Sequence, residues 1–373
     1  MIRYCSRLAL LASIACFFSG CATLPHSSPL PQGSQLRKIS PADSGSPFSL
    51  QEGDGPLAFS DESLQLLDLK TGTKRLLAKE RPIAVAISAF DKRVAAAFPA
   101  GSGSIVRIYD AAGKVLAETT VGGRVTSIVW RNKDELVLAA LSIKKYSFGA
   151  QLDSILYRWD GIGKVLAIPA NGTTVRPYIA KMPDEALART FAMALSPYGD
   201  EVALTKLKDP PNFTPFLQIF THHLDSSGER QIGEAPLGSG GPVYAPGGEK
   251  VLMGNADGEA RWIPLSGGKE AEAYRSPGTS IALSPSGTYA LVDGHLYRER
   301  KEVTSFPPGT TGVFSSDGSV LVLRYRDAIY LLTGINDSPA PALSQDSRLM
   351  ELRRLRSKGL ITQEELEKAR GKH

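Results

Sequence analysis

A short motif that recurs along the chain constrains the fold more than any other feature of the sequence. Each copy is an apolar strand, a tight turn with Pro, Gly, Asp or Asn, and a second apolar strand, as in FAMALSPYGDEVAL. Short apolar segments separated by turn residues indicate β-strands rather than helices. The copies lie at residues 191–204, 279–292 and 310–323, more loosely at 85–98, 127–140 and 241–254, and most weakly at 46–59.

The spacing of these copies predicts an all-β propeller. Most copies continue with a third strand and a hairpin-like turn, as in SIVRIYDAAGKVLAE. Four strands in every forty residues or so are typical of a propeller blade. Seven blades are therefore expected over residues 36–335, and six or eight stay open because the first and last copies are degenerate. The residues that open the turns are Gln51, Ser88, Arg131, Ser196, Ala245, Ser284 and Ser315.

The three clearest turns have a structural explanation. Proline presets φ at the first turn position and glycine accepts a positive φ, so these serines need no catalytic role. The rhythm of strands and turns resembles that of WD-repeat and TolB-type propellers, and this resemblance implies an architecture more than a function. The turn residues are Ser196, Pro197, Gly199, Ser284, Pro285, Gly287, Ser315, Asp317 and Gly318.

Closure of the ring gives a sharper prediction. The last copy supplies three strands, and residues 336–345 that follow form a linker too rich in proline for a fourth. Residues 36–40, with the sequence LRKIS, precede the first blade and belong to no copy. Because an unpaired strand edge would otherwise stay exposed, we expect residues 36–40 to close the last blade as its outer strand.

Residues 1–20 have the three-part layout of a secretion signal. Arg3 and Arg7 precede the apolar run Leu8–Phe18, which is too short to cross a hydrocarbon core of about 30 Å as a helix. All three cysteines lie within the first 21 residues. A disulfide scaffold or a cysteine metal site in the body of the chain is therefore excluded.

The end of this segment resembles the lipobox of bacterial lipoproteins, here Phe18, Ser19 and Gly20 before Cys21. The resemblance implies acyl chains on the Cys21 thiol and attachment to a membrane. It also implies the outer membrane with its periplasmic face, because the next residue is Ala rather than Asp. The alternative is an ordinary cleaved signal with an incidental cysteine. Residues 21–35 are rich in Pro, Ser and Gly and are expected to be a flexible tether.

The C-terminal segment, residues 346–373, favours a pair of short helices. Leucines three apart share one helical face, Gly359 can end the first helix, and a capping box can start the second. The segment resembles the SHOCT (short C-terminal domain) module, which implies docking to a protein partner or self-association. The residues of the pattern are Leu349, Leu352, Leu355, Gly359, Ile361, Thr362, Glu364, Glu365 and Leu366.

Three insertions interrupt the rhythm of the blades, at residues 142–153, 169–190 and 206–216. We expect them to project from one end of the ring, where extended loops commonly carry recognition. Their basic and aromatic residues suit an acidic partner or a glycan, and the equal alternative is that the loops pack on themselves. These residues are Lys144, Lys145, Tyr146, Phe148, Arg176, Tyr178, Lys206 and Phe213.

The sequence offers little for catalysis or for binding a metal or cofactor. His222, His223 and Asp225 form the only histidine cluster, but adjacent strand residues point to opposite faces and no third ligand is visible. No HExxH, GxSxG or phosphate-loop motif occurs. No metal and no cofactor is expected, and the net charge of +5 on 373 residues is too small to favour nucleic acid.

These features favour a membrane-anchored binding or scaffold lipoprotein of the cell envelope rather than an enzyme. The propeller would be the recognition platform, and the C-terminal helices would dock or oligomerise. Two alternatives stay open. One is a hydrolase that acts on an envelope glycan in the central channel, and the other is a component of envelope assembly machinery.

Overall fold

The computed structural model describes most of the chain from residue 24 to residue 337. The described ranges are 24–41, 48–50, 55–60, 62–163, 165–169, 172–225, 228–326 and 328–337, together with Thr362. The lipobox, Cys21, the turn that Gln51 opens and the expected C-terminal helices, except Thr362, lie outside these residues.

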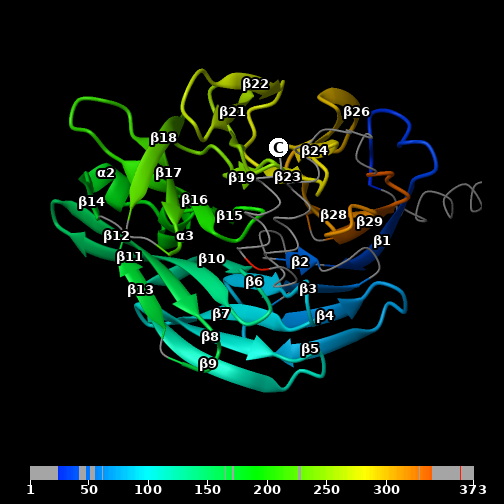
Figure 1. Cartoon of the computed structure of the whole chain (residues 1–373), viewed down its shortest axis with the longest axis horizontal. Helices are drawn as coiled ribbons and strands as arrows, with labels where there is room; N and C mark the ends of the chain where they lie inside the picture. Colours follow the sequence, from blue (N-terminus) through cyan, green and yellow to red (C-terminus); the bar gives the residue numbers. More distant parts are fainter. Residues whose placement is uncertain are drawn as a thin grey trace, which may run out of the picture.

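Seven antiparallel sheets stand around a ring (Figure 1), which confirms the prediction of an all-β propeller with seven blades. Blades 1 and 2 follow each other along the chain. Blade 1 consists of β2 (Phe48–Leu50), β3 (Pro56–Ser60), β4 (Leu64–Asp68) and β5 (Lys74–Ala78). Blade 2 consists of β6 (Ala84–Ile87), β7 (Val94–Ala100), β8 (Gly103–Tyr109) and β9 (Val115–Gly122).

Blades 3 and 4 carry the longest strands and the insertions. Blade 3 consists of β10 (Arg124–Trp130), β11 (Leu136–Tyr146), β12 (Gly149–Trp159) and β13 (Leu166–Pro169), with the short β14 (Thr173–Val175) also paired to β12. Two short helices follow it, α2 (Pro177–Ala180) and α3 (Asp184–Ala188). Blade 4 consists of β15 (Met193–Leu195), β16 (Glu201–Lys208), β17 (Phe216–His223) and β18 (Glu229–Pro236).

The last three blades complete the ring. Blade 5 consists of β19 (Val243–Tyr244), β20 (Lys250–Met253), β21 (Ala260–Pro264) and β22 (Ala271–Tyr274). Blade 6 consists of β23 (Ile281–Leu283), β24 (Tyr289–Val292), β25 (His295–Arg298) and β26 (Lys301–Ser305). Blade 7 consists of β27 (Thr311–Phe314), β28 (Val320–Tyr325), β29 (Ala328–Thr333) and the N-terminal strand β1 (Gln35–Pro41).

The N-terminal strand closes the ring as predicted. β1 pairs antiparallel with β29, from Gln35 opposite Thr333 to Pro41 opposite Ala328, and so forms the outer edge of blade 7. At the centre, β2 of blade 1 contacts β27 of blade 7. Each blade therefore has a neighbour on both sides. The second strands are buried on both faces for this reason, as at Val94–Phe98 and Leu136–Leu141.

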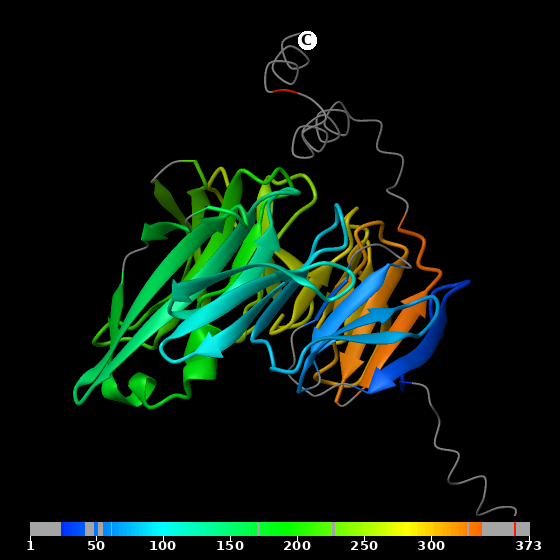
Figure 2. The same ribbon diagram turned by 90° about the horizontal axis from the view of Figure 1, so that it is seen from below.

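The two faces of the ring differ in the turns that they carry. Because neighbouring strands are antiparallel, the first-to-second turns of all blades and the third-to-fourth turns of blades 1 to 6 lie on one face, here called the turn face. The second-to-third turns and the connections between blades lie on the other, the insertion face. The β11–β12 hairpin tip, α2, α3 and residues 209–215 therefore share one face, and Figure 2 shows both helices on one side of the ring.

The turn face carries the repeated motif. In six blades the residue that opens the turn donates its backbone N–H to a carbonyl oxygen across the turn, at 2.8–3.0 Å. Gly199, Gly287 and Gly318 have φ near +70°, the conformation that the turn requires and that glycine adopts without strain. The opening residues are Ser88, Arg131, Ser196, Ala245, Ser284 and Ser315.

The expectation of a flexible tether is corrected for residues 24–34. Leu24 is fully buried in a cluster between blades 6 and 7. The backbone N–H of Ser27 donates to the carbonyl oxygen of Ser305 at 2.8 Å, and Thr304 Oγ1 donates to the carbonyl oxygen of Ser28 at 3.1 Å. A composition rich in Pro and Ser did not reveal that one leucine fits this cluster. In the described part of the chain, no helix is long and apolar enough to cross a membrane.

Candidate binding site on the insertion face

The three insertions pack against one another. β14 adds to the edge of the long β11–β12 hairpin, opposite Ala150–Leu152. Arg176 donates to the carboxylate of Asp209 from its backbone N–H at 2.6 Å and from Nε at 2.9 Å, and to the carbonyl oxygen of Phe213 at 3.0 Å. Burial alone would raise the pKa of Asp209, but the hydrogen bonds from Arg176 outweigh it and hold that pKa below its ordinary value.

Four of the predicted aromatic and basic residues form an exposed group that we call the aromatic tip. Tyr146, Phe148, Tyr178 and Phe213 are 50%, 70%, 51% and 72% exposed. The rings of Tyr146 and Phe148 stack with centroids 5.4 Å apart. Tyr178 and Phe213 are joined through Arg176, which donates to the Tyr178 hydroxyl at 2.9 Å. The insertions are thus both packed on themselves and exposed at their aromatic side chains.

The predicted basic residues of the insertions are mostly paired. Lys145 Nζ lies 2.8 Å from Asp184 of α3, and Lys144 Nζ lies 3.6 Å from Asp153. Lys206 is a correction, because it lies within β16 and not in a loop. Its side chain is 7% exposed and its Nζ lies 2.6 Å from Glu229 of β18.

Two neighbouring pockets lie beside α3 on the insertion face. The first, of about 650 Å³, lies against α3 and the start of β10, and the second, of about 730 Å³, lies against the loops that enter blades 5, 6 and 7. Arg189, which directly follows α3, lines both pockets. The side chains that line the first pocket include Arg81, Arg124, Glu185, Arg189 and Phe191.

The first pocket has an excess of positive charge. Arg124 Nη1 lies 2.9 Å from Glu185 Oε1, so these two charges compensate each other. Arg189 is exposed, and its guanidinium makes no hydrogen bond or ion pair with any residue that the structure describes. Arg81 adds a further positive charge to the wall. A planar guanidinium with five free donors suits a carboxylate or phosphate.

The second pocket is lined by hydroxyl groups and one fixed carboxylate. Asp293 accepts hydrogen bonds from Ser276 and Thr279 hydroxyls and from the backbone N–H groups of Gly278 and Ser280, at 2.6–2.9 Å. Burial alone would raise the pKa of Asp293, but these four bonds lower it. Asp293 therefore holds the loop of residues 276–280 in place, and its carboxylate is already occupied by these bonds. The Thr311 hydroxyl on the same wall is buried without a partner among the described residues.

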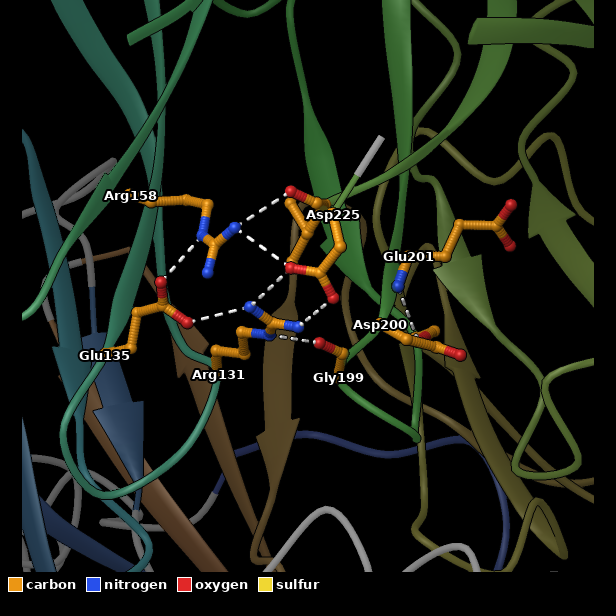
Figure 3. Close-up of polar contacts among 9 residues, drawn as sticks. Arg131, Glu135, Arg158, Gly199, Asp200, Glu201 and Asp225 are labelled. Atoms are coloured by element: carbon orange, nitrogen blue, oxygen red, sulfur yellow. Dashed lines mark hydrogen bonds and ion pairs between the residues drawn. The ribbon is translucent and has the colours of Figure 1, made fainter. Parts of the chain in front are cut away.

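The turn face has a different cluster of charges, in which every charge is paired (Figure 3). Arg131 Nη1 lies 2.9 Å from Glu135 and its Nη2 lies 2.9 Å from Asp225, while Arg158 lies 2.7 Å from Glu135 and 3.0 Å from Asp225. Arg131 Nε also donates to the carbonyl oxygen of Gly199 at 2.6 Å. These contacts join blade 3 to blade 4. Hydrogen bonds from Arg131 lower the pKa of Asp225.

The histidine cluster offers no site of its own. His222 is 2% exposed on β17, and neither ring nitrogen has a hydrogen-bond partner among the described residues. His223 Nε2 lies 3.5 Å from Glu201, and Asp225 pairs with arginines instead. Across the described ranges, no group of three or more His, Cys, Asp or Glu residues is arranged to hold a metal ion.

The central channel is apolar at the turn face. A pocket of about 410 Å³ there is lined mainly by residues of the innermost strands, among them Val85, Ile128, Val129, Leu195 and Val313. Among the described residues, Arg131 is the one charged residue that lines this pocket, whereas four charged residues line the first pocket on the insertion face. Sequence reasoning missed Arg81, Arg124 and Arg189, because they come from three separate parts of the chain and form no local motif.

Comparisons with known proteins identify the fold of this chain but no family. No family model matches the chain, and no curated protein matches it. An oligogalacturonate lyase in complex with manganese shares 13% identity at a TM-score of 0.55, over 84% of this chain and 97% of that one. A chain of a mitotic checkpoint complex shares 14% identity at a TM-score of 0.54, over 84% of this chain and 96% of that one. TolB from Acinetobacter baumannii shares 14% identity at a TM-score of 0.42, over 76% of this chain and 78% of that one.

These likenesses correct one prediction from the sequence. The prediction that this chain is not an enzyme is wrong, because its propeller is shared with a lyase and the architecture gave no ground for excluding catalysis. At 13% and 14% identity the likenesses show the fold alone, and they extend to chains as different as a lyase and a part of a checkpoint complex.

Proposed function

We propose that this chain is a lipid-anchored propeller of the bacterial cell envelope that recognises an acidic saccharide on its insertion face. The observation that carries the proposal is Arg189, an exposed guanidinium without a partner among the described residues, at the edge shared by the two pockets. Arg81 adds positive charge on one side, and the hydroxyl-rich wall of the second pocket suits the sugar hydroxyls on the other.

Binding of an oligogalacturonate tests this proposal. The chain is titrated calorimetrically with that acidic oligosaccharide and with a neutral maltooligosaccharide of equal length. Arg189→Gln should weaken oligogalacturonate binding about tenfold, the usual effect of losing one charge-assisted hydrogen bond. Lys269→Gln is the matched control, because Lys269 is an exposed cation in the β21–β22 turn on the opposite face. Equal binding of both saccharides, or an equal loss in both variants, would contradict the proposal.

A second candidate function is conversion of such a saccharide on the insertion face, and the likeness to an oligogalacturonate lyase favours it. The measurement is the appearance of new reducing ends when the chain is incubated with the same oligosaccharide. If Arg189 binds the substrate, Arg189→Gln should raise KM more than it lowers kcat. Turnover that is unchanged by Arg189→Gln would place the chemistry elsewhere.

The anchor and the tail are separate parts of the proposal. A lipid on Cys21 would hold the chain at the outer membrane with the propeller in the periplasm, and residues 346–373 would dock to a protein partner or to a second copy. Labelling with a radioactive fatty acid should mark the wild type and fail in Cys21→Ser. Crosslinking of the full chain and of a chain without residues 346–373 should capture different partners. Identical partners would contradict a docking role for these residues.

A further inference from the structure

The first pocket on the insertion face contains a second arginine, whose partner is an exposed carboxylate. Arg124 starts β10, Glu185 lies in the first turn of α3, and both line this pocket. Arg124 Nη1 lies 2.9 Å from Glu185 Oε1, and the two side chains are 29% and 61% exposed. Exposed ion pairs contribute no more than about 1 kcal/mol, because water competes for both charges. A ligand can therefore separate this pair at little cost.

The carboxylate of Glu185 can leave Arg124 without a change in the fold. Among the described residues, Arg124 is the one side chain that pairs with this carboxylate. The helix itself is held in other ways. Leu187 is fully buried in the core, and Asp184, beside Glu185, lies 2.8 Å from Lys145 Nζ of β11. Only the side chain of Glu185 therefore has to move when a ligand takes its place.

Arg189 and Arg124 line the same pocket but differ in what a ligand must do to reach them. The guanidinium of Arg189 has no partner among the described residues, whereas Glu185 neutralises Arg124. A ligand with one carboxylate can bind Arg189 without breaking an ion pair. A second carboxylate can replace that of Glu185 on Arg124, because a guanidinium binds any carboxylate through the same planar donors. The pocket can therefore distinguish ligands by the number of their acidic groups.

We propose that Glu185 is a competing carboxylate, which yields Arg124 to the second acidic unit of a saccharide and so selects oligomers over single uronic acids. The inference rests on the proposed function, in which Arg189 binds the first carboxylate of an acidic saccharide. A single uronic acid binds through Arg189, and Arg124 stays paired with Glu185. An acidic disaccharide gains a second charge-assisted contact.

The test compares digalacturonate with galacturonate in calorimetric titrations of the full chain at about 0.15 M salt, which screens distant charges. Glu185→Gln should bind digalacturonate about three- to fivefold more tightly, the effect of removing one exposed ion pair. Arg124→Gln should weaken digalacturonate binding about fivefold and leave galacturonate binding unchanged. Asp184→Asn is the matched control, because it removes the same charge one residue away but releases Lys145, which lines neither pocket. Its affinity should change less than twofold.

A double-mutant cycle shows whether Glu185 acts through Arg124. Glu185→Gln should lose its effect on digalacturonate binding when Arg124 is already replaced by Gln. An equal gain in Glu185→Gln and Asp184→Asn, or no gain in either, would overturn the inference, and binding that still depends on Arg189 would leave the proposed function intact. Failure of the wild type and all variants to bind either saccharide would overturn both.

Discussion

Two arginine sites on opposite faces of the propeller use charge in opposite ways. On the turn face, Arg131 and Arg158 lie between Glu135 and Asp225, and every charge has its partner at 3.0 Å or less. On the insertion face, Arg189 stands at the edge of two pockets and has no partner in the described part of the chain. The first arrangement holds two blades together, and the second is available to a ligand.

This difference shows that charge alone does not identify a site in a propeller. A paired arginine has already exchanged its water for a carboxylate, so a ligand would have to break that bond first. An unpaired arginine beside a pocket keeps its donors for the ligand and contributes little to folding. Substitution of Arg131 should therefore affect mainly stability, and substitution of Arg189 should affect mainly ligand binding.

The largest expected effect is on stability at the turn face. Arg131→Leu leaves the carboxylates of Glu135 and Asp225 with one arginine and leaves the carbonyl oxygen of Gly199 without its donor. We expect the free energy of unfolding to fall by about 2–3 kcal/mol, the usual cost of breaking a largely buried charged network. Chemical denaturation measures this change.

Arg189→Leu is the matched control for this prediction. Because its guanidinium is exposed and contacts no described partner, the free energy of unfolding should change by less than about 0.5 kcal/mol. Oligogalacturonate binding should respond in the opposite order, with a loss in Arg189→Leu and none in Arg131→Leu at temperatures where it stays folded. Equal losses of stability in the two variants would abolish the distinction between the faces.

The parts of this molecule that could be predicted from the sequence are those set by short-range rules. The turns at Ser196 and Ser284 depend on residues within a few positions of each other, so their pattern can be recognised in the sequence. The spacing of these turns then predicts the number of blades. The closing strand at residues 36–40 followed from counting, because a ring with three strands in its last blade needs a fourth from elsewhere.

The rest depends on residues that are distant in sequence. Arg81, Arg124 and Arg189 reach one pocket from three separate parts of the chain, and nothing local marks them as neighbours. The repeat predicts a loop at Lys206, but β16 is longer than the repeat predicts and includes this residue. The composition around Leu24 predicts a tether, whereas its burial depends on a cluster of apolar side chains from blades 6 and 7.

A smaller effect should appear in the pH dependence of stability. Burial lowers the pKa of His222 below its ordinary value of about 6.5, so the folded chain disfavours its protonated form. The unfolded chain then binds the proton first, and stability should fall as the pH drops below about 6.5. His222→Leu should flatten this dependence in thermal melts between pH 8 and pH 5, whereas His223→Gln, at an exposed position, should leave it unchanged.

The smallest expected effect concerns Asp225, the exposed member of the turn-face cluster. Its side chain is 66% exposed, so Asp225→Asn should lower the free energy of unfolding at neutral pH by no more than about 0.5–1 kcal/mol. Arg131 lowers the pKa of Asp225, so its stabilising effect is present above the ordinary value of about 3.9 and is lost as the pH falls below it. Denaturation curves of the wild type and the variant should therefore differ at pH 7 and converge near pH 2. A difference that persists at pH 2 would show that Asp225 acts through packing and not through its charge.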